Sequence, residues 1–560
     1  MSRNANAYFS AVPRADISRS RFNRDSRLLT TFNAGDLIPI FVDEVLPGDT
    51  VTMDTASLVR MSTPIFPTMD NAYLDTYFFF VPNRLVWKHW KELNGENNTS
   101  YWTQPTEYRV PLIGSPVGGW SKGSVADYMG LPIGIQYGAN NGDASVGVSA
   151  LPFRAYSLIW NEFFRDQNYM SPAYVSVDDG YLSGVDRVAG DRWAGIENAY
   201  LGGNLLPVAK FHDYFTSVLP APQKGEPVRI PFDLDNGFLP VYADPVPHNV
   251  SSAPLSWDVK SGDVPAYLTV DEQGVTRVVD SNLGDGYSAT YPNNLYAGLV
   301  PEAMGTINDL RQAFQVQKLL EADARGGTRY VEILNAHFGV TSPDARLQRP
   351  EYLGGKRIPI NIDQVLQTSA TNSVSPQGNA AAFSMTTDVD SSFTKSFVEH
   401  GYIIGLCCVR TDHTYQQGID KMWLRKRRFD FYWPELANIS EQPVYTDEIL
   451  TDSRPEMSGE VFGYQEAWAD YRYRPSRVTG AFRSDYQQSL DCWHYADHFY
   501  SPSGSFVADR DFMIETPVNI DRTIAVQSSE EDQFLANFYF KATWTRPMPM
   551  FSVPGLADHH

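Results

Sequence analysis

The sequence has 560 residues, a formal net charge of −21 and 13% aromatic residues. A balance this acidic argues against a protein whose whole surface binds nucleic acid, although one basic face stays compatible with it. No run is long and apolar enough to span a bilayer, and no charged-then-apolar leader opens the chain. We therefore expect neither a membrane span nor export through a signal peptide.

The three cysteines are odd in number and lack the spacing of a zinc site; they are Cys407, Cys408 and Cys492. The adjacent pair is not a redox motif either. This pattern predicts buried, reduced thiols in a protein made in the cytosol.

Residues 1–30 are polar and basic. They hold two aspartates and six arginines, which are Arg3, Arg14, Arg19, Arg21, Arg24 and Arg27. No hydrophobic period is sustained there, which predicts an extended basic N-terminal arm. The arm either contacts phosphates or a neighbouring subunit, or is a solvated terminus, and the composition leaves both interpretations open.

Two apolar, β-branched and aromatic runs follow, at residues 37–45 and 73–81. Such residues suit a pleated, half-buried surface, so both runs predict strands. The sequence Pro47-Gly48-Asp49 ends the first run as a turn. Residues 77–81 are unbroken apolar, which predicts either a strand covered on both faces or one that leaves a sheet for an interface.

Four segments have the pattern of helices: residues 83–93, 151–168, 306–325 and 328–338. In residues 151–168, aromatic residues repeat at helical spacing and predict a core-facing helix. In residues 306–325, Thr306 and Asp309 form a capping box, and the pair Gly326-Gly327 ends the segment. The last two segments predict a helical hairpin.

Residues 221–300 have the character of an insertion. They contain many prolines and glycines and hold four Lys/Arg against ten Asp/Glu. Short strand-like pieces at 267–270 and 275–279 predict a hairpin with its loop at 271–274. An acidic segment of this kind repels phosphates, so we expect a surface insertion that lies outside the core and faces away from any nucleic acid.

The later segments 352–365, 383–385, 403–410 and 429–433 again predict strands. Strands are therefore many and far apart in the sequence, with helices lodged in the connections between them. This pattern favours a mainly β protein, an antiparallel sandwich, over a parallel α/β sheet.

The densest basic segment begins at Lys421 and is surrounded by aromatic residues. Its candidate nucleic-acid-binding residues are Arg425, Lys426, Arg427 and Arg428. Clustered cations beside aromatic rings suit single-stranded nucleic acid, where bases stack and phosphates pair. The alternative is that these charges face acidic neighbours within the protein. A second, sparser basic set consists of Arg472, Arg474 and Arg477.

Two short patterns offer catalytic or metal chemistry and neither is convincing. Residues 119–123 match the nucleophile-elbow pattern, but the required strand is missing before Ser121. His494 and His498 have i,i+4 spacing, but no glutamate stands between them and the neighbouring aromatics indicate packing. We expect no catalytic residue, no metal and no cofactor.

Long stretches resemble the major capsid proteins of small icosahedral single-stranded-DNA phages, the microviruses, and most of all the gokushovirus branch. The resemblance is carried by residues 37–50 (LIPIFVDEVLPGDT), 72–87 (AYLDTYFFFVPNRLVW), 307–327, 421–444, 462–480 and 482–484. These matches follow the expected order over nearly the whole chain. They weaken at 221–300, which resembles the variable insertion that projects at the threefold axes.

The resemblance implies an eight-stranded antiparallel jelly roll with large loop insertions, spanning residues 31–560. It implies a T=1 shell, made of copies of this chain, around a circular single-stranded DNA genome. The implied partners are a small basic DNA-packaging protein, a minor pilot protein and a bacterial cell-surface receptor. The implied location is the virion, assembled in the host cytoplasm.

A second interpretation is a β-sandwich protein that binds glycans or acts on them. The many aromatic residues and the scattered carboxylates support it. The lack of a signal peptide and of a paired-carboxylate motif weakens it. The two interpretations differ in self-assembly, which electron microscopy of the expressed protein would detect.

Overall fold

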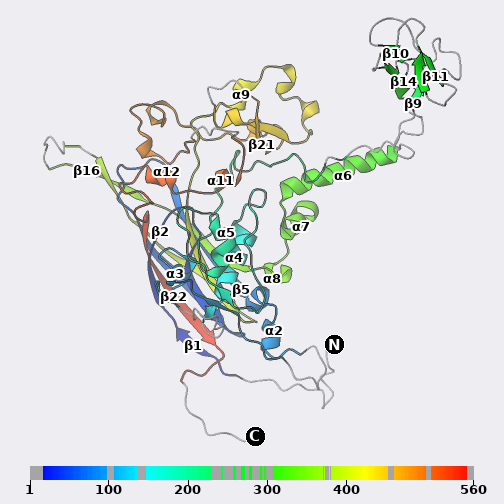
Figure 1. The fold of residues 1–560 in the computed structure, drawn as a ribbon. Coiled ribbons are helices and arrows are strands. Elements are labelled where there is room, and N and C mark those ends of the chain that lie inside the picture. Colours follow the sequence, from blue (N-terminus) through cyan, green and yellow to red (C-terminus); the bar gives the residue numbers. More distant parts are fainter. Residues whose placement is uncertain are drawn as a thin grey trace. The chain divides into compact units, whose positions relative to one another are not determined.

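The computed structural model describes residues 17–97, 106–136, 147–226, 228, 307–369, 371, 377–378, 380–451, 459–499 and 506–551, and the backbone of six short strands between 241 and 297. The chain divides into two compact units. One consists of Met1–Pro222 with Asp323–His560, and the other of Gln223–Ala322. Figure 1 labels their helices and strands, and each unit is described by itself.

The first unit is built on two antiparallel sheets. In the described part of the chain, the first sheet has the order β1–β22–β4–β18, with β2 also on β22. Its strands are β1 (Ser20–Asn23), β2 (Ser26–Phe32), β4 (Thr50–Met61), β18 (Thr386–Ser396) and β22 (Phe534–Arg546). β1 pairs with residues 543–546 and β2 with residues 534–540, so the two form one interrupted edge along β22.

The second sheet has the order β15–β5–β19–β3. Its strands are β3 (Ile38–Val45), β5 (Ala72–Pro82), β15 (Glu351–Pro359) and β19 (Gly401–Thr411). Successive strands β2, β3, β4 and β5 alternate between the two sheets, and so do β18, β19 and β22. This alternation is the winding of a jelly roll. The predicted mainly β, antiparallel jelly-roll class is confirmed.

Two hydrophobic cores lie on the two faces of the second sheet. The core between the sheets contains Phe78, Phe538 and Trp544. The other core contains Phe79, Trp87 and further aromatic side chains from the connections. β5 and β19 are therefore buried on both faces, as the unbroken run at 77–81 predicted in one of its two interpretations.

The main helix on the second core is α4 (Leu151–Ile159), which continues as a π-helical turn, η2 (Trp160–Phe164). The hydroxyl of Tyr156 donates to the carbonyl of Leu37 at 2.8 Å, and the indole of Trp160 donates to the carbonyl of Pro207 at 2.6 Å. The predicted helix at 151–168 is correct in position but ends earlier, because Arg165 takes an extended backbone.

The predicted helix at 83–93 is two short helices, α1 (Asn83–Val86) and α2 (Trp90–Leu93). Trp87 interrupts them with an extended backbone (φ −150°), while its buried indole donates to Asp179 Oδ1 at 2.6 Å. Packing of this ring therefore outweighs the local helical pattern.

Both helices of the predicted hairpin are present, as α6 (Ile307–Gly326) and α7 (Tyr330–Phe338). α7 ends at Gly339, whose φ of +65° suits glycine. Thr306, the first residue of the predicted capping box, lies outside the described residues.

The remaining helices and strands of the first unit are short. Its helices are α3 (Val125–Tyr128), α5 (Ala194–Asn198), α8 (Asp344–Leu347), α9 (Lys421–Leu424), α10 (Ala469–Arg472), α11 (Arg510–Met513) and α12 (Val518–Asp521). Its small strands are β6 (Leu112–Gly114), β7 (Val148–Ser149), β8 (Leu182–Ser183), β16 (Ile362–Leu366), β17 (Ala380–Ser384), β20 (Gln442–Tyr445) and β21 (Val461–Gln465). Among the helices that the structure describes, none has the length and apolar character needed to cross a bilayer.

The second unit contains three antiparallel strand pairs in its described residues. They are β9 (Val241–Ala243) with β14 (Leu295–Ala297), β10 (Trp257–Val259) with β13 (Thr290–Pro292), and β11 (Tyr267–Val270) with β12 (Thr276–Val279). The pairing of β11 with β12 confirms the predicted hairpin.

The segment predicted as a basic arm contributes to the first sheet. From Ser20 onward it forms β1 and β2, and Arg24 makes an ion pair with Asp43 at 2.8 Å. Arg3 and Arg14 lie outside the described residues.

Candidate nucleic-acid interface

The basic segment forms part of the long connection that follows β19. It contains α9 and then a single 3₁₀ turn, Arg428–Asp430. Oδ2 of Asp430 accepts the backbone N–H groups of Lys426 at 2.8 Å and Arg427 at 2.7 Å, and these two bonds lower the pKa of that carboxyl. The strand predicted at 429–433 is therefore wrong: the aspartate closes a turn, and the aromatic residues around it stay largely exposed.

Arg425 makes its contacts with neighbouring residues of the protein. Its guanidinium makes an ion pair with Asp470 of α10, and its Nε donates to the carbonyl of Asp430 at 2.9 Å. The same group lies 4.2 Å from the ring centroid of Tyr471. Both partners of the ion pair are mostly buried, so Arg425 ties the basic segment to α10.

The other three predicted cations are exposed. Lys426, Arg427 and Arg428 make no ion pair with any residue that the structure describes. Arg428 lies 4.7 Å from the ring centroid of Trp433. These three charges are free to meet phosphates from outside the subunit.

The second basic set lies beside the first. Arg472, Arg474 and Arg477 line a cavity of about 350 Å³ together with Lys421 and Arg425. Arg472 pairs with Glu466 at 2.6 Å, and Arg477 donates to Asp420 at 2.8 Å. Arg474 is exposed and has no carboxylate partner among the described residues. The fold thus brings together two sets that lie some 45 residues apart in the sequence.

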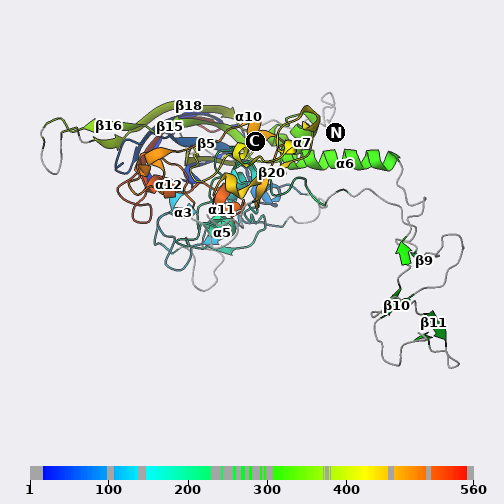
Figure 2. The same ribbon diagram turned by 90° about the horizontal axis from the view of Figure 1, so that it is seen from above.

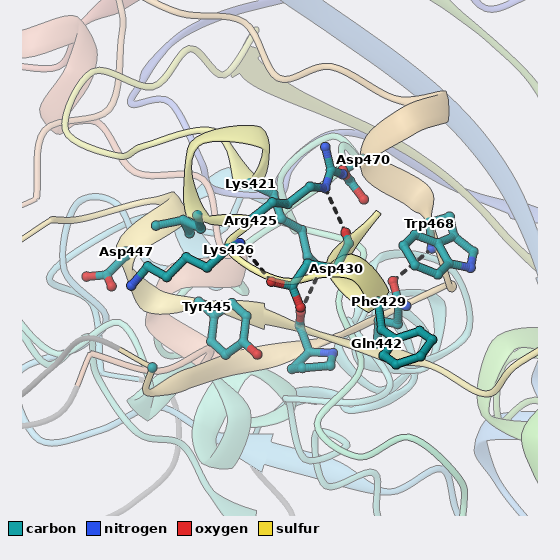
Figure 3. Close-up of a pocket in the computed structure, with 13 residues that line it drawn as sticks. Lys421, Arg425, Lys426, Phe429, Asp430, Gln442, Tyr445, Asp447, Trp468 and Asp470 are labelled. Carbon is teal, nitrogen blue, oxygen red and sulfur yellow. Dashed lines mark hydrogen bonds and ion pairs between the residues drawn. The ribbon is translucent and has the colours of Figure 1, made fainter. Parts of the chain in front are cut away.

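A larger cavity of about 480 Å³ is also lined by Arg425 (Figure 3). In this view, Tyr445 stands on one side and Phe429 and Trp468 stand on the other, with Asp430 between them. The other residues lining it are Lys421, Leu424, Arg425, Lys426, Gln442, Pro443, Asp447, Gly459 and Asp470.

The charges that line this cavity balance. Its three cations face three carboxylates, Asp430, Asp447 and Asp470, and burial raises the pKa of Asp447. The interior therefore has no excess attraction for an anion, whereas carboxylates and ring faces suit the amino groups and faces of bases. Arg427 and Arg428 do not line this cavity, so the excess positive charge of the segment lies outside it.

Trp468 occupies an unusual backbone position at the cavity wall. Its φ of +63° is left-handed, a conformation that costs on the order of 1–3 kcal/mol for residues other than glycine. Its indole donates to the carbonyl of Leu436 at 2.8 Å, and its backbone N–H donates to Gln442 Oε1 at 3.0 Å. These bonds hold the ring in place. Sequence reasoning missed Trp468, Gln442 and Asp470 as cavity residues, because no spacing rule connects them to residues 421–428.

Exposed aromatic rings surround the free cations. They are Trp423, Phe429, Phe431, Tyr432, Trp433, Tyr471 and Tyr473. We call these rings, together with Lys426, Arg427, Arg428 and Arg474, the basic–aromatic face. Exposed rings of this density are uncommon on a free protein surface and mark a binding surface.

The two weak chemical patterns have ordinary structural explanations. His494 contacts the carbonyl of Phe482 at 2.8 Å, and His498 makes an ion pair with Asp485 at 2.9 Å, so the two histidines do not face one site. Ser121 lies in a loop and its hydroxyl donates to Asp186. Within the described ranges, no three histidine, cysteine or acidic side chains gather to hold a metal.

The jelly-roll sandwich is an architecture that viral capsid proteins share with lectins and cupins. Comparison with known families identifies the capsid class: the model of the capsid protein (F protein) family matches residues 10–556. The chain belongs to this family.

Three capsid proteins named VP1 are similar over nearly the whole chain. That of Bdellovibrio phage phiMH2K is 40% identical over 552 residues, which cover 98% of this chain and 97% of the relative. That of Spiroplasma virus 4 is 41% identical over 562 residues, with the same coverage. That of Chlamydia phage 1 is 39% identical over 594 residues, again with the same coverage.

These relatives confirm the resemblance to microvirus capsid proteins. They make the chain a structural protein of the virion and not an enzyme, so the interpretation as a glycan-active protein is set aside.

Proposed function

We propose that copies of this capsid protein form a T=1 icosahedral shell around a circular single-stranded DNA genome, and that the basic–aromatic face contacts that DNA. The observation that carries the DNA contact is the exposure of Lys426, Arg427 and Arg428 beside aromatic rings, without carboxylate partners in the described part of the chain. T=1 symmetry and the circular genome rest on the resemblance to gokushoviruses.

Single-stranded DNA can make both kinds of contact that the basic–aromatic face offers, stacking on rings and pairing with cations. Its bases can stack on exposed rings such as Trp423 and Phe429, which is worth about 1–3 kcal/mol per base and is tolerant of sequence. Its phosphates can pair with Lys426, Arg427 and Arg428. The carboxylates inside the neighbouring cavity leave phosphates outside it and accept amino groups of a base.

The acidity of the chain supports the presence of a basic partner protein in the particle. With a net charge of −21, each subunit repels DNA everywhere except at a local basic face. Subunits alone therefore cannot neutralise a packaged genome. A small basic DNA-packaging protein, which the family resemblance implies, supplies the missing charge, and a minor pilot protein completes the particle. Assembly takes place in the host cytoplasm.

We also propose that the insertion at 221–300 faces outward and contributes to attachment to a bacterial cell-surface receptor. Its ten acidic residues against four basic ones disfavour a position beside DNA. Loops that stand on a rigid scaffold commonly carry recognition.

The test of the DNA contact is the combined variant Lys426→Gln, Arg427→Gln and Arg428→Gln. Shells should form in normal yield but hold several-fold less DNA, measured as nucleic acid per shell after sedimentation. Normal DNA content would contradict the proposal.

The matched control removes the same charge elsewhere, at Lys91, Arg311 and Lys318, all exposed and without ion pairs among the described residues. It should package normally. An equal loss of DNA in the control would show that total charge matters and that the basic–aromatic face does not.

A further inference from the structure

The outer face of the first sheet carries several exposed apolar side chains among its polar ones. β4 and β22 alternate strictly, with one set of side chains in the core and the other set outside. The outer set of the sheet includes Leu29 (67% exposed), Val389 (75%), Leu535 (50%) and Tyr539. In the strand register, Tyr539 and Val389 both stand opposite Ala56, so apolar residues follow one another across the sheet.

Exposed apolar side chains also occur on the hairpin formed by β16 and β17. Asp363 pairs with Phe383, and Val365 pairs with Ala381, so these four side chains share one face of the hairpin. Phe383 and Val365 are 47% and 46% exposed. β17 leads directly into β18, so the hairpin is attached at one edge of the sheet.

The hairpin has no core of its own. In the described residues β16 and β17 pair only with each other. Both views show β16 extending away from the two sheets of the unit (Figures 1 and 2). An isolated two-stranded hairpin is marginally stable in water at best, so a hairpin with exposed phenylalanine and valine gains from a surface that covers it.

A matching hollow lies at the opposite edge of the same sheet. It has a volume of about 450 Å³, and it is lined by Leu28, Leu29, Thr30, Thr31, Lys122, Asp127, Tyr128, Leu535 and Ala536. We call it the edge groove. Its apolar part comes from β2, at the edge of the sheet away from β18, and from the neighbouring strand β22.

The charges beside these two features are complementary. Asp363, on the hairpin face, has no cationic partner among the described residues. Arg27 is two residues from Leu29 on the same face of β2, and its Nε donates to Asn537 Oδ1 at 2.8 Å. It makes no ion pair within the described part of the chain. Asp363 and Arg27 thus both lack an oppositely charged partner within the described part of the chain, and they lie toward opposite edges of the sheet.

We propose that Val365 and Phe383 of one copy seat in the edge groove of a second copy of this chain, with Asp363 paired to Arg27 across the contact. The occupant is a second copy because both halves of the contact occur once on each chain, at opposite edges of one sheet. Such a head-to-tail contact repeats from copy to copy and closes a ring around a symmetry axis. It rests on shell assembly and is independent of the proposed DNA contact.

Disulfide cross-linking tests this geometry in the assembled shell. The variant carries Leu29→Cys and Phe383→Cys, with Cys492→Ala to remove the one native cysteine that is not fully buried. Within one chain, Leu29 on β2 is three strand spacings, roughly 14 Å, from β18, and Phe383 lies still farther away, in β17. The two positions are therefore too far apart for a disulfide. Oxidation should therefore give a ladder of covalently linked chains that reductant abolishes.

The control pair is Leu29→Cys with Val398→Cys, because Val398 is 88% exposed and lies beyond the other end of β18. It should give no ladder. Assembled shells without a ladder from the first pair, or equal ladders from both pairs, would overturn the proposal.

If the cysteine variant does not assemble, exchanging the charges of Asp363 and Arg27 tests the contact instead. Asp363→Arg alone and Arg27→Asp alone should each lower shell yield at least tenfold while the subunits stay folded. The two changes together should restore most of the yield. A double variant that assembles no better than the single ones, or single variants that assemble normally, would overturn the contact. The readout is shell yield by sedimentation, so its failure is distinct from a failure of DNA packaging.

Discussion

The guanidinium of Arg425 forms an ion pair with the carboxylate of Asp470, and the two side chains are only 9% and 13% exposed. Arg425 therefore has a different role from its sequence neighbours Lys426, Arg427 and Arg428. One cation holds the connection together, and the other three face solvent.

The first prediction concerns this pair. Arg425→Gln leaves the carboxylate of Asp470 without its partner, which should lower the free energy of unfolding by roughly 2–4 kcal/mol. Arg427→Gln, an exposed cation without an ion pair in the described residues, should change it by less than about 0.5 kcal/mol. Urea denaturation of unassembled subunits measures the free energy of unfolding of both variants. Equal losses would contradict the different roles of Arg425 and Arg427.

The second prediction concerns the pH dependence of a buried cluster at His413. Its Nδ1 lies 2.8 Å from Asp497 and its Nε2 lies 3.3 Å from Glu515, while Lys210 also pairs with Asp497 at 3.4 Å. Burial alone lowers the pKa of His413, but Asp497 and Glu515 outweigh burial and Lys210 and raise this pKa to about 9.

Because the folded-state pKa is raised, the stabilisation from His413 is complete below pH 6.5 and is lost as the pH rises to about 9. The loss amounts to roughly 3 kcal/mol. We expect thermal unfolding to show this alkaline loss in the wild type and in His212→Gln, an exposed control, but not in His413→Gln. An identical pH profile for His413→Gln and the wild type would contradict the assignment.

The third prediction concerns the corner where the two sheets meet. A Cβ on Gly354 would lie 2.2 Å from the carbonyl oxygen of Ser392, a contact that backbone must move to relieve. Gly354→Ala should therefore destabilise the subunit by about 2 kcal/mol or more. Gly180→Ala, where the added methyl meets open space, should be nearly neutral. Thermal unfolding of the two variants compares them directly.

The fourth prediction concerns the insertion. Replacing residues 225–294 with a short Gly/Ser linker should give intact particles that no longer adsorb to host cells, since the proposal assigns recognition to this segment and shell contacts to the jelly roll. Adsorption assays on purified particles measure this outcome. Particles that adsorb normally would refute the attachment role, and a chain that no longer folds would refute the separation of the insertion from the core.

The strands of the jelly roll could be predicted from local pattern. The runs at 37–45 and 73–81 correspond to β3 and β5, and the unbroken apolar stretch in β5 follows from burial on both faces. β-branched and aromatic residues in such positions report the core directly. Sheet order could not be predicted from pattern, because strands that pair, such as β2 and β22, are separated by hundreds of residues.

Local pattern failed where a single side chain decides the backbone. Residues 429–433 have strand propensity, but the carboxylate of Asp430 binds two backbone N–H groups and makes a turn. Trp87 breaks a helix because its ring is buried. At the candidate site, the basic residues could be named from the sequence, but the pairing of Arg425 with Asp470 depends on a tertiary contact between segments 45 residues apart.

We propose that this chain builds a T=1 shell whose basic–aromatic face contacts packaged single-stranded DNA. An electron cryo-microscopy reconstruction of purified particles tests it most directly. We expect an icosahedral T=1 shell with Lys426, Arg427 and Arg428 on the inner surface and DNA density against Trp423 and Phe429. Isolated monomers, or a shell in which these residues face outward, would contradict it.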